Sequence, residues 1–84
     1  MTGAPTRKRV LLIDDETVFV DAVTNVLTRR GIRVQSAHDG YGALELLTNE
    51  EFDVLVLDLR MPGMVGLATL RAIREQDELT PVIL

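Results

Sequence analysis

Two short aliphatic runs, each followed directly by aspartate, constrain the fold of this chain most strongly. The first run, Lys8–Ile13, precedes the sequence DDE at positions 14–16, and the second, Phe52–Leu57, precedes Asp58. Both runs are almost continuously apolar instead of alternating, which is typical of parallel strands that are covered on both faces. The sequence therefore predicts a parallel sheet with helices on both sides.

The segments between the strands have helical periodicity. From Thr17, apolar residues recur along one helical face, and Gly31 follows as expected of a C-terminal cap. The residues of that face are Phe19, Ala22, Val23, Val26 and Leu27. The other predicted elements are a strand at Ile32–Ala37, a helix at Tyr41–Glu50, a third helix marked by Leu67, Leu70 and Ile73, and a strand at Thr80–Leu84. This alternating order predicts one open sheet with right-handed crossovers.

Composition excludes several classes of protein. Nine Lys plus Arg against thirteen Asp plus Glu give a formal net charge of −4, which argues against direct nucleic-acid binding. The basic cluster Arg7-Lys8-Arg9 is interpreted as part of a solvated leader. Cysteine is absent, so disulfides and thiolate zinc sites are excluded. The apolar runs are shorter than a signal-peptide core of roughly 7–15 residues or a membrane span, so we expect a cytoplasmic protein without membrane contact.

The aspartates at the strand ends are the candidate site. Parallel strands present their carboxyl ends at one edge of the sheet, so Asp14, Asp15 and Asp58 are expected to meet in one crevice. Three neighbouring carboxylates repel one another unless a cation lies between them. Oxygen ligands without His or Cys favour a hard divalent ion, and few carboxylates plus waters suit Mg²⁺ better than Ca²⁺.

No chemistry is predicted for His38, Met61 or Met64. His38 is the only histidine; as a phosphohistidine or metal ligand it has no neighbouring His, so a solvated turn residue is the interpretation. Met61 and Met64 are interpreted as packing residues of the Pro- and Gly-rich loop that follows Asp58.

With these features the chain resembles the receiver domain of bacterial two-component response regulators. The matching motifs are Asp14-Asp15-Glu16, the segment Asp58 to Gly63, Asp39-Gly40 with Ala43-Leu44, and Gly66-Leu67. The resemblance implies an α/β fold, the flavodoxin-like (CheY-like) doubly wound parallel sheet with strand order 2-1-3-4-5. It divides the chain into a polar leader at 1–7 and a receiver domain at 8–84.

The resemblance also implies a function and a set of site residues. Asp58 is expected to be the phosphoacceptor that takes a phosphoryl group from a sensor histidine kinase or phosphotransfer protein. Asp15 is expected to bind Mg²⁺ directly, Asp14 mainly through water, and Arg60 through its backbone carbonyl, with Glu16 outside this set. The domain is then a signalling module and not an enzyme.

Two departures from the family pattern are visible. Val65 stands where the family often has an acid. The chain also ends within the family's fourth strand, before the Ser or Thr and the Lys that bind phosphoryl oxygens, so self-phosphorylation is expected only in a complete domain. An exposed fourth strand at Pro81–Leu84 further predicts that the 84-residue chain folds poorly alone or self-associates through that edge.

Two rival functions remain open at this stage. An aspartate-nucleophile, Mg²⁺-dependent phosphohydrolase also uses acids at strand ends, but its family pattern D-x-D-x-T is not met by Asp58-Leu59-Arg60. The second alternative is an interaction fragment without phosphoryl chemistry. Dinucleotide binding is excluded because no G-x-G-x-x-G follows the first strand.

Overall fold

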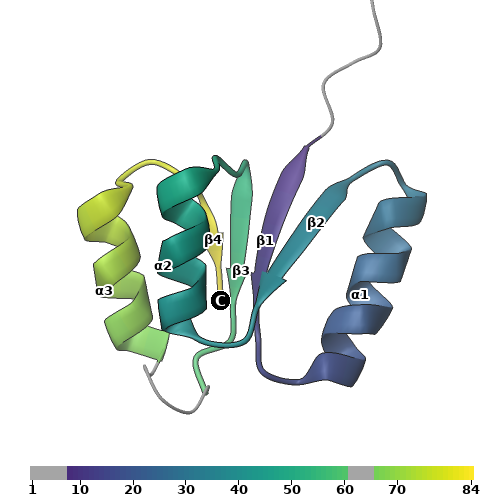
Figure 1. The fold of residues 1–84 in the computed structure, drawn as a ribbon, viewed down its shortest axis with the longest axis horizontal. Helices are drawn as coiled ribbons and strands as arrows, with labels where there is room; N and C mark the ends of the chain where they lie inside the picture. Colours follow the sequence, from purple (N-terminus) through teal and green to yellow (C-terminus); the bar gives the residue numbers. More distant parts are fainter. Residues whose placement is uncertain (1–7, 61–65) are drawn as a thin grey trace, which may run out of the picture.

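The computed structural model describes residues 8–60 and 66–84 (Figure 1). The predicted leader and the loop with Met61, Met64 and Val65 lie outside the described residues. The elements, in chain order, are β1 (Arg9–Ile13), α1 (Thr17–Arg29), β2 (Arg33–Ala37), α2 (Gly40–Asn49), β3 (Val54–Leu57), α3 (Gly66–Gln76) and β4 (Val82–Ile83). The predicted order of elements is confirmed, with bounds that shift by one or two residues at most ends.

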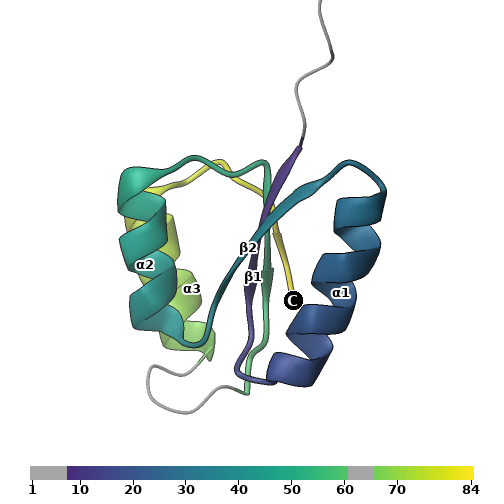
Figure 2. The ribbon, with the colours of Figure 1, turned by 45° about the vertical axis from the view of Figure 1, so that its right-hand side comes forward.

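The strands form one parallel sheet in the order β2-β1-β3-β4. Helix α1 covers one face of the sheet, and α2 and α3 cover the other, as Figures 1 and 2 show from two directions. The predicted doubly wound α/β fold is therefore confirmed. In this topology β1 and β3 are neighbours, so their carboxyl ends lie side by side.

The core lies mainly between the sheet and the α2/α3 layer. Side chains that alternate along β1 and β3 point into it, and Leu11, Ile13 and Leu55 have no exposed surface. Ala43 and Ile73 meet them from the two helices, with Leu44, Leu47 and Leu70 packed around this cluster. The aliphatic core anchors the two strands that carry the acids.

Local signals set the ends of two helices. Gly31 follows α1 with a φ of 84°, a left-handed conformation that glycine adopts without steric cost. The N–H of Gly31 donates to the Thr28 carbonyl and the N–H of Ile32 to the Leu27 carbonyl, each at 3.0 Å, which closes a Schellman motif. At the start of α2, the Asp39 carboxylate accepts the Gly42 N–H at 2.8 Å.

Two predicted helix faces are corrected. On α1, Phe19 and Val26 are 48% and 52% exposed, whereas Val20 is buried against the sheet. On α3, Leu67 is 62% exposed, whereas the predicted Ile73 is buried and Leu70 packs against the core, beside the buried Gly66 and Thr69. The periodicity located the helices correctly. The face that each helix buries against the sheet is rotated relative to the face with the most apolar side chains.

The amino edge of the sheet is held by Arg9, the first residue of β1. Its guanidinium forms an ion pair with Glu50 and lies 5.1 Å from the centre of the Phe52 ring. Gln35 donates to the same Glu50 carboxylate at 2.9 Å. Arg9, one of the three residues of the predicted basic cluster, therefore belongs to the folded domain and not to a solvated leader. No helix among the described residues is long and apolar enough to cross a membrane.

Candidate functional site

Asp14 and Asp58 lie at matching positions on neighbouring strands. Ile13 pairs with Leu57 in the parallel register, and each aspartate follows directly. The Asp58 N–H donates to the Ile13 carbonyl at 2.9 Å, and the Asp14 N–H donates to the Ala37 carbonyl at 3.0 Å. The hydrogen bonds of the sheet therefore extend to the backbone of both acids.

The same local turn follows each strand. The Asp14 Oδ1 accepts the Glu16 N–H at 2.9 Å, and the Asp58 Oδ1 accepts the Arg60 N–H at 2.9 Å. Such turns are common for aspartate, whose short side chain bonds to the backbone two residues ahead. Each carboxylate is thereby held by one oxygen and keeps its second oxygen for another partner.

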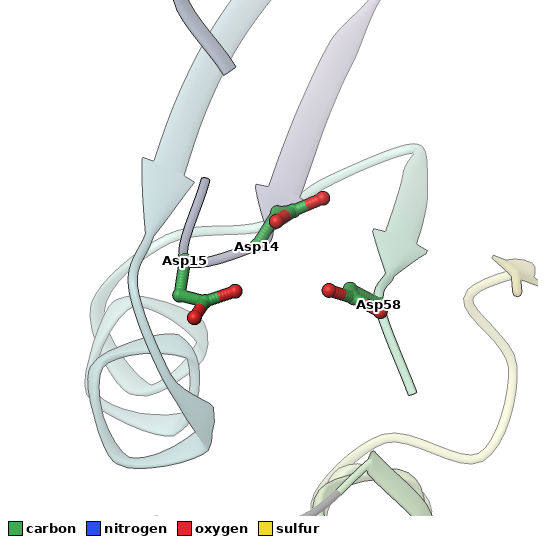
Figure 3. A group of neighbouring side chains, drawn as sticks. All are labelled: Asp14, Asp15 and Asp58. Carbon is green, nitrogen blue, oxygen red and sulfur yellow. The ribbon is translucent and has the colours of Figure 1, made fainter. Parts of the chain in front are cut away.

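The three predicted acids converge at the carboxyl edge of the sheet (Figure 3). Each of Asp14, Asp15 and Asp58 offers one carboxylate oxygen, and these oxygens lie within 4.8 Å of one another. Asp14 and Asp58 are half-buried and Asp15 is exposed. The structure thus brings Asp58 close to Asp14 and Asp15, which precede it by more than forty positions in the sequence.

None of the three acids forms an ion pair with a described residue, since the one ion pair in that part of the chain is Arg9–Glu50 at the opposite edge. An open cavity of about 370 Å³ adjoins the acids and is lined in part by Glu16, Phe19 and Arg60. A ligand can therefore approach the carboxylates from solvent. Carboxylate oxygens near water form the type of donor set that Mg²⁺ favours.

The other sequence predictions have separate outcomes. Arg60 lies beside the acids through its N–H contact with Asp58, and the role of its carbonyl stays a prediction. Glu16 is exposed next to the cluster, and His38 is an exposed residue after β2 that is not among the clustered ligands. Gly66, the first residue of α3, is not among the predicted site residues.

The comparisons with known proteins agree with this geometry. Residues 10–84 match the family model of the response regulator receiver domain. The transcriptional regulatory protein TrcR of Mycobacterium tuberculosis is 42% identical over 81 residues, which cover 96% of this chain and 31% of that protein. The chain spans about a third of the length of the curated relatives that it matches.

Solved structures share the fold. TrrA of Thermotoga maritima, solved in complex with Mg²⁺-BeF, is 31% identical with a TM-score of 0.84, over 92% of this chain and 67% of that one. A structure of the histidine kinase ThkA in complex with TrrA matches with 29% identity and a TM-score of 0.82, over 89% and 65% of the two chains. Because the family model matches almost the whole of this chain, the chain belongs to the response regulator receiver domain family.

Proposed function

We propose that this receiver domain accepts a phosphoryl group on Asp58 from a phosphohistidine of a sensor histidine kinase or phosphotransfer protein. The observation that carries the proposal is the convergence of three carboxylate oxygens within 4.8 Å at the open edge of the sheet. Membership of the receiver family supports the phosphoacceptor role. We expect a domain with this role to act in the cytoplasm.

The residues present fit a bound Mg²⁺ ion. Asp14, Asp15 and Asp58 would hold it, together with the backbone carbonyl of Arg60, and waters would complete the roughly six oxygens that Mg²⁺ prefers. When bound, the ion offsets the charge of the carboxylates and of the transferring phosphoryl group. The structure of TrrA was solved with Mg²⁺-BeF, which supports this choice of metal for the family.

The Asp58 carboxylate has one oxygen suited to attack. Its Oδ1 accepts the Arg60 N–H at 2.9 Å and has a second lone pair for Mg²⁺, which leaves Oδ2 as the nucleophile. In the transfer, a bond forms between Oδ2 and phosphorus while the P–N bond of the phosphohistidine breaks. The electron pair of that bond remains on the imidazole of the donor, which takes up a proton from solvent. Positioning and charge compensation carry most of the rate enhancement in such transfers.

A mass measurement on the full-length protein tests the proposal. Incubation with a small phosphodonor and Mg²⁺ should add one phosphoryl group, and a chelator should prevent it. Asp58→Asn should abolish the adduct. Asp53→Asn is the matched control and should retain the adduct, because the exposed Asp53 carboxylate accepts the Arg9 N–H away from the site. Rapid release of inorganic phosphate without an adduct would indicate the phosphohydrolase instead. Neither adduct nor turnover would refute the phosphoacceptor role and favour an interaction module.

A further inference from the structure

Gly66, the first residue of α3, lies directly against the backbone of Leu59. A Cβ atom at position 66 would lie 2.3 Å from the Leu59 Cα, 2.7 Å from its carbonyl oxygen and 2.8 Å from its carbonyl carbon. All three atoms belong to the main chain, so no side-chain rotation relieves the overlap. Any residue other than glycine at position 66 therefore has to displace Leu59 or the start of α3.

Leu59 connects the two residues at the centre of the site. Asp58 is held from the other side by its N–H bond to the Ile13 carbonyl, and the Arg60 N–H is bonded to the Asp58 carboxylate, both at 2.9 Å. The segment 58–60 is thus fixed by β1 on one side and by Gly66 on the other. A shift of Leu59 has to move the Arg60 carbonyl or the Asp58 carboxylate, because these groups are one peptide unit away.

The described glycines Gly31 and Gly42 do not show this close approach. A Cβ at Gly42, in the first turn of α2, would meet the Asp39 Oδ1 at 3.4 Å and the Ala37 Cβ at 3.5 Å, which are ordinary contacts. A Cβ at Gly31 would meet nothing within 4 Å. Of these three glycines, Gly66 alone lies too close to a neighbouring backbone to accept a Cβ atom.

We propose that Gly66 is a positioning residue, whose missing side chain lets α3 support the segment Asp58–Arg60 in the geometry that binds Mg²⁺. The inference rests on the proposed function and adds to it a residue that touches neither metal nor phosphoryl group. Substitution of residues that contact the metal ligands but not the metal typically lowers metal affinity about 10- to 100-fold.

A magnesium titration of the full-length protein, followed by amide NMR, tests the role of Gly66. Gly66→Ala is compared with Gly42→Ala, since both substitutions place alanine in the first turn of a helix. The concentration of Mg²⁺ at half-saturation should rise about tenfold or more in Gly66→Ala and stay at the wild-type value in Gly42→Ala. Thermal unfolding without metal shows whether each variant is folded, so that a loss of affinity is separated from a loss of structure.

Each outcome has one meaning. Equal Mg²⁺ affinity in a folded Gly66→Ala and in wild type would overturn the positioning role while leaving the proposed function intact. A wild-type spectrum that does not respond to Mg²⁺ would refute the proposed metal site itself. If Gly66→Ala does not fold, the wild-type titration shows whether Gly66 responds to the binding of Mg²⁺. The Gly66 amide signal should move with the same midpoint as that of Asp58, and a Gly66 signal that stays still would overturn the inference.

Discussion

Replacing Asp58 by asparagine should stabilise the metal-free domain, because it removes one charge from a cluster of three. The carboxylate oxygens of Asp14, Asp15 and Asp58 lie within 4.8 Å of one another. Two unit charges at that distance repel by about 0.9 kcal/mol in bulk water, and Asp58 takes part in two such pairs. Screening at physiological salt, with a Debye length of about 8 Å, reduces the sum of the two pairs to about 1 kcal/mol. Asparagine keeps the Oδ1 that accepts the Arg60 N–H, so the turn after β3 should persist.

Magnesium should reduce the difference in stability between Asp58→Asn and wild type. A ligand at ten times its dissociation constant raises the free energy of unfolding of the protein that binds it by about 1.4 kcal/mol. Wild type should gain this amount, whereas Asp58→Asn should gain less because it has lost one anionic ligand. The variant is therefore expected to be more stable than wild type with a chelator present, and this difference should shrink when Mg²⁺ is added at ten times the wild-type dissociation constant.

Thermal unfolding of the receiver domain by circular dichroism measures both effects. A difference of 1 kcal/mol corresponds to about 4–8 °C in Tm for a domain of 60–100 residues. Glu45→Gln removes one charge from an exposed position on α2 away from the acids and is the matched control. The gain in Asp58→Asn should shrink as NaCl is raised. An Asp58→Asn variant that is no more stable than the control at low salt, or that responds to Mg²⁺ like wild type, would refute this reasoning.

Two further predictions concern stability away from the site. Leu55→Ala, at a fully buried position of β3, should lower the free energy of unfolding by about 2–5 kcal/mol in urea denaturation, while Leu79→Ala at an 89% exposed position should change it little. Bonds from the Thr80 hydroxyl and from the backbone N–H groups of Thr80 and Leu79 lower the pKa of Asp77 below its ordinary value of 3.8. The ionised Asp77 therefore stabilises the fold above pH 3.8, and this contribution is lost as the pH falls through the lowered pKa. In urea unfolding, Asp77→Asn should be less stable than wild type at neutral pH and equally stable in strong acid.

The order of strands and helices could be predicted from the sequence because each element carries its own local signal. The continuous aliphatic runs of β1 and β3, the glycine after α1 and the turn before α2 are recognisable without knowledge of any neighbour. The convergence of Asp14 and Asp58 followed from one topological rule, that parallel strands end at the same edge. The candidate acids were therefore identifiable before their distances were known.

The tertiary structure decided which face of each helix is buried and how closely the elements approach. Phe19, Val26 and Leu67 fit an apolar stripe but are exposed, because the buried face depends on where the sheet lies and not on the helix alone. The contact of Gly66 with Leu59 could not be read from the sequence, since periodicity defines the direction of a side chain but not the distance to another backbone. Burial and close approach are properties of packed pairs of elements, so they arise only when the chain is folded.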